Sequence, residues 1–244
     1  MVLDGGMIHD GDSDGKCKMP LFGCRRPVDA DDGEFLRARK SMVDNQLRRN
    51  GIGDERVLAA MDKVPRELFV PPRRRYDAYC DGALAIGSGQ TISQPYMVAL
   101  MTELLHLRGE ERVLEVGTGS GYQAAVLAEL SAHVYTVERL PELSERARRL
   151  LCDELGYGNI SFRVGDGTLG WPEEAPFDRV IVTAGAPRRP DTVLAQLGPG
   201  GEAVVPVGRH WQVLTHYARR ADGTFDEEES CQCVFVKLIG EDGW

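Results

Sequence analysis

The stretch Val113-Leu-Glu-Val-Gly-Thr-Gly-Ser-Gly-Tyr122 places an apolar run directly before three glycines on alternate positions. It continues into the segment 123–130, which is rich in good helix formers. A strand, a glycine turn and a helix N-terminus in this order make a ligand site, because glycine lets the backbone come close and the helix N–H groups face the ligand. The stretch therefore predicts an α/β fold with a small molecule bound at the turn.

The segments around this turn alternate between expected strands and expected helices. Strands are expected at Arg112–Val116, His133–Glu138, Ile160–Val164, Arg179–Thr183 and Glu202–Val207, and helices at Ser120–Ser131, Pro141–Leu155 and Pro190–Leu197. The strands are short, apolar and rich in β-branched residues, as expected when both faces of a sheet are covered. This rhythm predicts a doubly wound, mostly parallel sheet. Two closing strands are expected at Gln212–Ala218 and Cys231–Ile239, with Asp222–Glu229 as an acidic turn between them.

The chain before the sheet divides into a tail and a helical region. Residues 1–33 are rich in Gly and Asp without apolar periodicity, so we expect a disordered tail. Residues 34–244 are expected to form one domain, in which 34–109 supply helices and a substrate loop and 110–244 supply the cofactor-binding sheet and the closing strands. Within it we expect helices at Glu34–Asn50, after an N-cap at Asp54, and at Tyr96–Leu107, a turn or extended linker at Pro71-Pro72, and a loop or short strands at Asp81–Gln90.

One segment of the tail resembles a metal loop. Asp10-Gly-Asp-Ser-Asp-Gly15 matches the start of a calcium-binding loop, but Leu21 stands where that loop needs a bidentate Glu. We therefore interpret the segment as a solvated acidic tail.

Composition limits the classes of function. The formal net charge of −9 over 244 residues argues against a whole-surface nucleic-acid footprint, which needs a basic face. No apolar signal core or membrane-length stretch occurs, so the cytoplasm is the expected compartment. The cysteines lack zinc spacing and are interpreted as reduced, mostly packing residues; they are Cys17, Cys24, Cys80, Cys152, Cys231 and Cys233. The five histidines form no sequence pattern and are expected at surface or packing positions.

The choice of ligand for the glycine turn depends on its neighbours. The dinucleotide fingerprint G-x-G-x-x-G/A meets Tyr122 when it starts at Gly117, although it can be forced when it starts at Gly119. Glu115, two residues before Gly117, completes the E-x-G-x-G-x-G pattern of S-adenosylmethionine-dependent methyltransferases, with a structural strand-to-helix turn as the alternative. An acid suits a site beside a sulfonium and an ammonium group. The cofactor-binding residues predicted here are Glu115, Gly117, Thr118, Gly119, Ser120 and Gly121.

Two further acids stand at the ends of the next strands. Glu138 can accept hydrogen bonds from both ribose hydroxyls, with a surface acid as the alternative. Asp166, in Gly165-Asp-Gly167, can accept from an adenine amino group, with an Asp in an ordinary tight turn as the alternative. Open α/β sheets bind ligands at the carboxyl ends of their strands, so Glu138, Asp166 and Gly167 join the predicted cofactor site.

Several motifs together carry a family resemblance. In chain order, Gly87-Ser-Gly-Gln-Thr-Ile-Ser-Gln-Pro95, Leu114-Glu-Val-Gly-Thr-Gly-Ser-Gly-Tyr-Gln123 and Gly165-Asp-Gly167 resemble the protein-L-isoaspartate O-methyltransferases. Pro65-Arg-Glu-Leu-Phe-Val-Pro71 and Phe235-Val-Lys-Leu238 resemble them too, so the match runs from about Met42 to the C-terminus. Two positions depart from the family pattern. Lys237 stands where Pro is expected and could alter substrate contacts, and Gly185 stands where Ala is expected and could loosen a turn near the cofactor.

The resemblance implies a Rossmann-like methyltransferase that uses S-adenosyl-L-methionine. It implies methylation of the free carboxylate of isoaspartyl residues in damaged proteins and peptides, which initiates repair, and no action on nucleic acid or membranes; we expect a monomer. That α-carboxylate is already ionised at neutral pH, so no general base is needed. Hydroxyl donors suit such a nucleophile, which makes Ser93 the expected catalytic residue and Thr91 and Gln94 the expected substrate-binding residues. A plain helix N-cap is the alternative role for Ser93.

Three other functions remain open from sequence. The first is a non-catalytic homologue that binds S-adenosylmethionine and recognises modified proteins. The second is a methyltransferase for another carboxylate or small molecule, which the Gly89-Gln-Thr-Ile-Ser-Gln-Pro95 segment disfavours. The third is a nicotinamide oxidoreductase, which Tyr122 disfavours.

Overall fold

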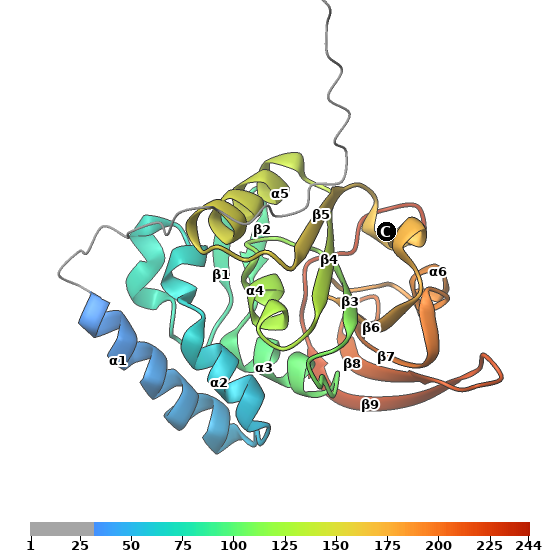
Figure 1. Cartoon of the computed structure of the whole chain (residues 1–244), viewed down its shortest axis with the longest axis horizontal. Helices are drawn as coiled ribbons and strands as arrows, with labels where there is room; N and C mark the ends of the chain where they lie inside the picture. Colours follow the sequence, from blue (N-terminus) through green and yellow to red (C-terminus); the bar gives the residue numbers. More distant parts are fainter. Residues whose placement is uncertain (1–31) are drawn as a thin grey trace, which may run out of the picture.

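The structure is a computed structural model that describes residues 32–244 (Figure 1). The calcium-loop resemblance, the interpretation of Cys17 and Cys24 as reduced thiols and the expected tail up to residue 31 lie outside the described residues. Residues 32 and 33, which were also assigned to the disordered tail, instead begin the helix α1 (Asp32–Met42). Among residues 32–244, no helix is long and apolar enough to cross a membrane.

A seven-stranded sheet in the order β5-β4-β3-β6-β7-β8-β9 forms the centre of the described chain (Figure 1). The strands β3 to β7 are parallel to one another, and β8 and β9 are antiparallel. The bounds are β3 (Arg112–Val116), β4 (His133–Glu138), β5 (Ile160–Val164), β6 (Phe177–Val182), β7 (Leu197–Val207), β8 (Gln212–Arg219) and β9 (Phe225–Cys233). The chain builds outward from β3 to β5 and then returns to the other side of β3 with β6. Such a reversal leaves a crevice at the carboxyl ends of β3 and β6, where ligands bind.

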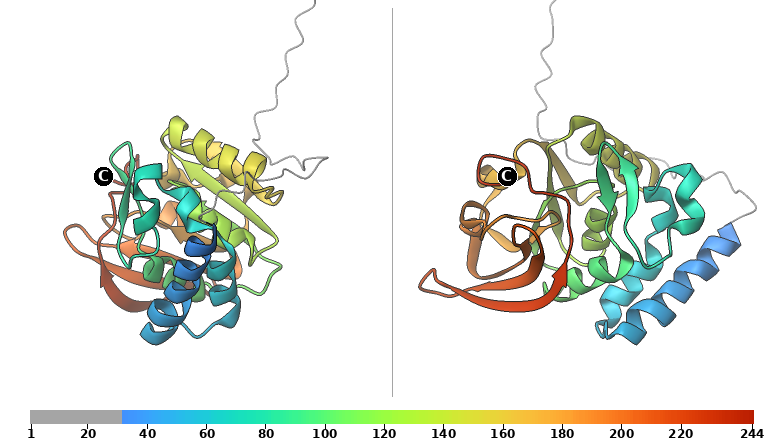
Figure 2. Two further views of the ribbon diagram at one scale, coloured as in Figure 1. Left: turned by 90° about the vertical axis from the view of Figure 1, so that its left-hand side faces the viewer. Right: turned by 180° about the vertical axis from the view of Figure 1, so that it is seen from behind.

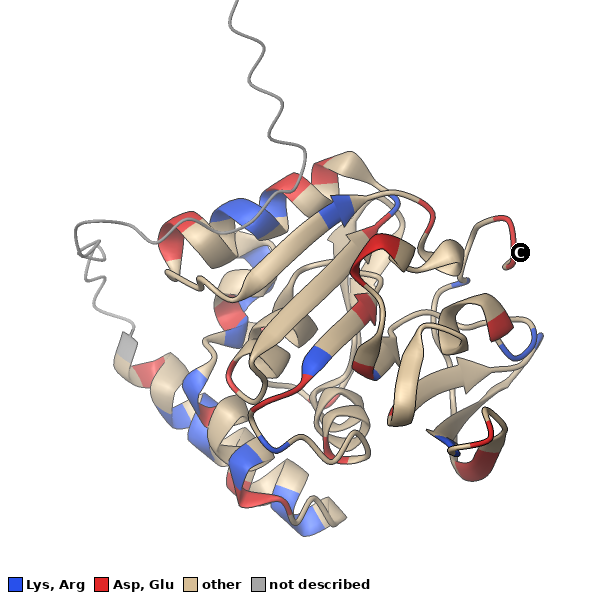
Figure 3. Cartoon of the chain, turned by 45° about the vertical axis from the view of Figure 1, so that its right-hand side comes forward, with Lys and Arg blue, Asp and Glu red and all other residues tan. Residues whose placement is uncertain are grey.

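The two faces of this sheet bury two separate cores. Val113 and Ile181 pack in one apolar cluster with the helices α1 to α5, whereas Leu114 and Val182 pack in the other cluster with α6. Successive side chains of a strand point to opposite faces, so strands that are covered on both faces must be apolar throughout. In Figure 3 the bodies of the central strands carry few charged residues and the outer helices carry many, as expected for strands covered on both faces.

The helices lie on both sides of the sheet, with α1 and α2 far from α6 (Figures 1 and 2). Their bounds are α1 (Asp32–Met42), α2 (Glu55–Lys63), α3 (Pro95–Glu103), α4 (Tyr122–Ala128), α5 (Pro141–Arg148) and α6 (Asp191–Leu194). Short π and 3-10 turns extend α1 as far as Asn50, where Gly51 (φ 100°) ends the helical run. The Asp54 side chain accepts from the Arg56 N–H, which confirms the predicted N-cap of α2. α4 and α6 are shorter than the sequence predicted.

Two predictions for the connecting segments were tested. The turn or extended linker expected at Pro71-Pro72 is present in part: Pro71 is extended (φ −56°, ψ 145°), whereas Pro72 begins the 3-10 helix Pro72–Asp77, where a fixed φ and a missing N–H are tolerated. The segment before α3 does contain short strands, β1 (Leu84–Gly87) and β2 (Gln90–Ile92), which pair as an antiparallel hairpin.

The closing strand differs most from the prediction. β9 begins at Phe225 and ends at Cys233, so the segment expected as an acidic turn lies mostly inside the strand, and residues 234–239 are not a strand. β9 is one of the two edge strands and is mostly exposed, so its acidic side chains can stay in water while the backbone pairs with β8. Asp226 and Glu227 also form ion pairs with Arg220 and Arg189.

The described cysteines follow the expectation in part. Cys80, Cys231 and Cys233 are free thiols. Cys152 is buried and disulfide-bonded, so the interpretation as a reduced cysteine is wrong at that position.

Candidate active site

The glycine turn after β3 depends on glycine for two physical reasons. Gly117, Gly119 and Gly121 all have positive φ values, of 104°, 53° and 86°. A Cβ on Gly117 would lie 2.4 Å from the Thr183 hydroxyl oxygen, and a Cβ on Gly121 would lie 2.9 Å from the Leu151 side chain. The Thr183 hydroxyl donates to the Gly117 carbonyl over 2.6 Å, which ties the turn to the end of β6. The turn is therefore fixed by packing before any ligand arrives.

One cavity joins this turn to the segment before α3. Most of the residues predicted from sequence line it together, namely Thr91, Ser93, Gly117, Thr118, Gly119, Ser120, Glu138 and Gly167. Gln94 instead lines an adjoining cavity that shares Thr91 and Ser93. The predicted residues that line neither cavity are Glu115, Gly121 and Asp166. Residues predicted to bind the cofactor and residues predicted to bind the substrate thus line one space.

Glu138 stands at the end of β4 and faces this cavity. One of its carboxylate oxygens accepts from the Gly119 N–H and the other from the Leu140 N–H, each over 2.9 Å. The side chain is only 8% exposed, so these contacts hold it in one orientation. Each carboxylate oxygen has further acceptor capacity, which suits a pair of neighbouring hydroxyl groups on a ligand.

Glu115 lies beneath the turn and has no exposed surface. Thr136 donates to one of its oxygens over 2.5 Å, and the Thr136 and Thr118 hydroxyls lie 2.5 Å apart. The other carboxylate oxygen has no hydrogen-bond partner in the described chain. Burial raises the pKa of Glu115 to about 8. The buried carboxyl thus keeps one acceptor oxygen without a described partner beneath the glycine turn.

Asp166 is held by the protein itself. One oxygen accepts from the Thr168 N–H at 2.9 Å and from the Thr168 hydroxyl at 2.7 Å, and the other accepts from the Glu241 N–H at 2.7 Å. Burial alone would raise the pKa of Asp166, but these hydrogen bonds keep it below its ordinary value. These contacts are those of an Asp in an ordinary tight turn, which was the alternative role considered for Asp166. The adjacent Gly167 lines the cavity and is packed so that a Cβ would lie 2.6 Å from Val116.

The side of the cavity lined by Thr91 and Ser93 has fewer hydrogen bonds between protein groups. The hydroxyls of Thr91 and Ser93 make no hydrogen bond to any described residue, so both can donate to a ligand. The N-cap of α3 is Gln94, with Pro95 in the first helical turn, so the N-cap role considered for Ser93 is wrong. Ser93 sits one residue before the cap, and its carbonyl accepts from Arg66 over 2.6 Å.

Arg66 is a positioning residue that sequence reasoning did not identify. It is fully buried, donates to the Ala78 carbonyl over 2.7 Å as well as to Ser93, and stacks 4.7 Å from the Tyr122 ring centre. It therefore links the Ser93 backbone to α4, the helix that follows the glycine turn. Its only sequence signal is its place in the Pro65–Pro71 motif.

The C-terminal segment forms a further side of the cavity, and of its residues only Lys237 was expected from sequence to affect substrate contacts. Val236, Lys237, Leu238 and Ile239 line the cavity, and the Lys237 ammonium lies 4.3 Å from the Trp244 ring centre. The two departures from the family pattern are neighbours, because Gly185 and Lys237 form an isolated bridge. A Cβ on Gly185 would lie 3.0 Å from the side chain of Gln212, so glycine suits this contact.

The sheet order, the glycine turn and the acid at the end of β4 define a class I methyltransferase, a Rossmann-like enzyme that uses S-adenosylmethionine. The sequence model of the family "Protein-L-isoaspartate(D-aspartate) O-methyltransferase (PCMT)" matches residues 37–243. The chain therefore belongs to that family, and its reaction is the S-adenosylmethionine-dependent methylation of isoaspartyl residues in protein repair.

Individual relatives agree with this assignment. The chain is 55% identical over 208 residues to the protein-L-isoaspartate O-methyltransferase of Geobacter metallireducens, a match covering 85% of this chain and 96% of the relative. It is 54% identical over 209 residues to that of Methanoculleus marisnigri, covering 85% and 94%.

Solved structures give the same result. A protein-L-isoaspartate O-methyltransferase structure is similar with a TM-score of 0.75 and 30% identity, covering 84% of this chain and 67% of the other. A Plasmodium falciparum homologue solved with S-adenosyl-L-homocysteine has a TM-score of 0.71 and 26% identity, covering 82% and 98%.

Proposed function

We propose that methyl transfer takes place in the single cavity where the glycine turn meets Thr91 and Ser93. The observation that carries the proposal is that residues from both halves line the same space. The cofactor supplies a methyl group on a positively charged sulfur. The chain's own residues then have to hold the two reactants in line, because orientation alone can lower a barrier by up to about 7–11 kcal/mol.

On the cofactor side, the proposed roles follow the contacts. Gly117, Thr118, Gly119 and Ser120 bring backbone close to the ligand, and Glu138 accepts from the ribose hydroxyls. Glu115 acts from below, where its buried carboxyl can ionise when a cationic group approaches. Gly121 supports the glycine turn by packing closely against Ala147 of α5 and against Leu151, which follows α5. Asp166 acts beside the adenine position through Gly167 and through the C-terminal segment that it holds.

On the substrate side, Ser93 and Thr91 donate to the isoaspartyl carboxylate. The pKa of such an α-carboxyl is about 3.3–3.7, so the group arrives as an anion. Neutral hydroxyls orient it without pairing away its charge, which keeps it nucleophilic. Gln94 contributes from the adjoining cavity, where an extended peptide substrate would continue. One carboxylate oxygen forms the new bond to the methyl carbon while the bond from that carbon to sulfur breaks, and no proton has to move.

The chain is proposed to be a cytoplasmic monomer that acts on proteins and peptides and not on nucleic acid or membranes. The net charge of −9 supports the exclusion of nucleic acid. Light scattering after size exclusion would test the monomer directly.

The activity is tested with labelled S-adenosylmethionine and a matched pair of peptides that differ only in Asp against isoAsp. The proposal predicts label in the isoAsp peptide and essentially none in the Asp peptide. Calorimetry on the same protein would show whether S-adenosylmethionine binds. Binding without incorporation into either peptide would favour the non-catalytic homologue, and incorporation into both peptides alike would favour a methyltransferase for another carboxylate.

A further inference from the structure

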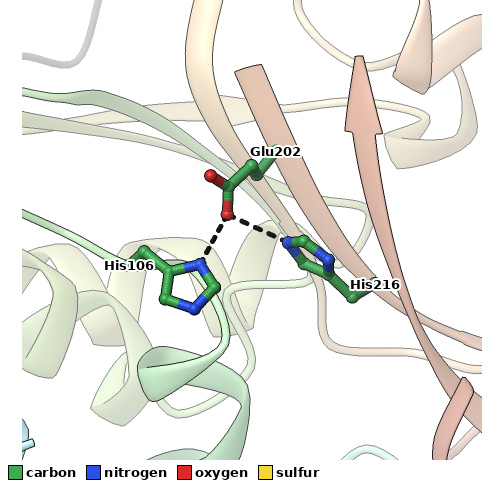
Figure 4. A group of neighbouring side chains, drawn as sticks. All are labelled: His106, Glu202 and His216. Atoms are coloured by element: carbon green, nitrogen blue, oxygen red, sulfur yellow. Dashed lines mark hydrogen bonds and ion pairs between the residues drawn. The ribbon is translucent and has the colours of Figure 1, made fainter. Parts of the chain in front are cut away.

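Two histidines and one glutamate converge far from the cavity. The His106 Nδ1 atom lies 2.7 Å from one carboxylate oxygen of Glu202, and the His216 Nε2 atom lies 2.9 Å from the same oxygen (Figure 4). The ligand-type atoms of the three side chains all lie within 4.8 Å of one another. Two of the five histidines, which showed no pattern in sequence, thus belong to one cluster in space.

The fold builds this cluster from well-ordered elements. Glu202 pairs with Ala218 across β7 and β8, so His216, two residues away on β8, lies diagonally on the same face. His106 comes from the connection between α3 and β3 and adopts a left-handed backbone (φ 48°), which few residues other than glycine do. Arg179 donates to the Leu105 carbonyl over 2.6 Å, which fixes the residue before His106.

The second carboxylate oxygen of Glu202 is occupied differently. The Arg179 guanidinium lies 3.7 Å from this second oxygen, Oε1. The two imidazoles contact the other oxygen, Oε2. His106 is exposed on the outer side, which leaves a coordination position open to solvent. Arg179 thus holds the oxygen of Glu202 that does not face the histidines, and such a contact orients a carboxylate that binds a metal through its other oxygen.

We propose that His106, Glu202 and His216 form a binding site for a divalent cation of the zinc class. Two imidazoles and one carboxylate, with a fourth position open, form a ligand set that zinc accepts. Calcium and magnesium prefer oxygen ligands and would be bound much more weakly. The metal takes the lone pairs of the two imidazole nitrogens that face Glu202, so any proton on those nitrogens moves to the other ring nitrogen or is released to solvent.

The position of the site assigns it a structural role. Glu202 pairs with Arg179 near the start of β6, whereas the cavity residue Thr183 follows the end of β6. At about 3.3 Å per residue the two sites are on the order of 13 Å apart along the strand. The bound metal joins the α3–β3 connection to β7 and β8, so it stabilises the fold and does not take part in methyl transfer.

The test is titration of the full chain with ZnCl2 after treatment with EDTA, followed by calorimetry, with Co²⁺ absorption as a reporter of coordination. The proposal predicts one equivalent bound and a higher melting temperature. His106→Ala and His216→Ala should each weaken binding by about tenfold or more. His106 is exposed, so its variant should fold even if the His216 variant does not. His210→Ala serves as the matched control, because His210 is an exposed histidine outside the cluster.

A second control addresses the free thiols of β9. The double variant Cys231→Ser, Cys233→Ser should keep the full affinity for zinc. The proposal is overturned if the wild-type chain binds no zinc, if the His106 variant binds as well as the wild type, or if the cysteine variant loses the site.

Discussion

The side of the cavity proposed to hold the cofactor (the cofactor wall: Gly117–Ser120, Glu138 and Thr183) and the side proposed to hold the substrate (the substrate wall: Thr91 and Ser93) differ in how firmly the protein holds their polar groups. On the cofactor wall, each oxygen of Glu138 accepts a backbone N–H, and the hydroxyl of Thr183 is bonded to carbonyls of the turn. On the substrate wall, the hydroxyls of Thr91 and Ser93 have no described partner. The difference indicates that the cofactor wall is preorganised for one constant ligand. The substrate wall keeps its donors available for a carboxylate that arrives on many different proteins.

The largest expected effect comes from adding a methyl group to the cofactor wall. Gly117→Ala places a Cβ 2.4 Å from the Thr183 hydroxyl oxygen at a φ of 104°. The backbone strain alone is of order 1–3 kcal/mol, and the clash displaces the turn. We expect the affinity for S-adenosylmethionine, measured by calorimetry, to fall by roughly two orders of magnitude or more. Gly109→Ala is the control, because its φ is 110° and a Cβ there meets nothing within 4 Å. Equal losses in both variants would contradict the account.

Asp166→Ala should have the next largest effect. The change removes the acceptor for the Thr168 and Glu241 N–H groups, so both Gly167 and the C-terminal segment lose support. We expect cofactor affinity to weaken by roughly tenfold, with the turnover number much less affected, since a lost hydrogen bond to a charged group costs about 1.5–3 kcal/mol. Asp222→Ala is a matched control, because Asp222 makes the same two contacts to Thr224 in an exposed turn. Identical behaviour of the two variants would show that the turn at Gly167 does not support the cofactor wall.

Glu115 gives a pH-dependent effect of smaller size. Burial raises its pKa in the folded, cofactor-free protein to about 8, above the ordinary value of about 4.3. Between these values the folded state holds a proton that the unfolded state releases, so stability falls as pH rises through this window. Glu115→Gln has no such proton. We therefore expect the melting temperature of the wild type, minus that of the variant, to decrease steadily from about pH 5 to about pH 8. A difference that does not change with pH would mean that Glu115 is already ionised.

The smallest effect is expected from pH on catalysis itself. The substrate carboxylate is ionised well below neutrality, and no histidine lines the cavity among the described residues. For an isoaspartyl peptide, kcat/KM should therefore be nearly flat from about pH 6 to about pH 8. A steep rise with an apparent pKa near 7 would reveal a general base on the substrate wall.

The sequence predicted the central strands well, and most of the residues that it assigned to the cofactor line the cavity. The bounds of β3, β4 and β5 match the predicted ones to the residue, because a strand covered on both faces must be apolar and its polar neighbours mark its ends. The glycine turn follows β3 directly and Glu138 is the last residue of β4, so the positions of both in the fold could also be predicted.

The features that the sequence did not predict depend on contacts between distant segments. β9 is acidic, and its strand character comes from pairing with β8 at an exposed edge. Asp166 is bonded to Glu241, a partner that no spacing rule could indicate. The meeting of His106 with His216 depends on strand register and on one left-handed residue.

The most direct test of the division between the walls is a crossed comparison of Ser93→Ala and Glu138→Gln. For each variant, the affinity for S-adenosylmethionine is measured by calorimetry and kcat is measured on an isoaspartyl peptide. The account predicts that Ser93→Ala lowers kcat by roughly 10- to 100-fold with unchanged cofactor affinity, and that Glu138→Gln mainly weakens cofactor binding. An equal loss of cofactor affinity in both variants would contradict it.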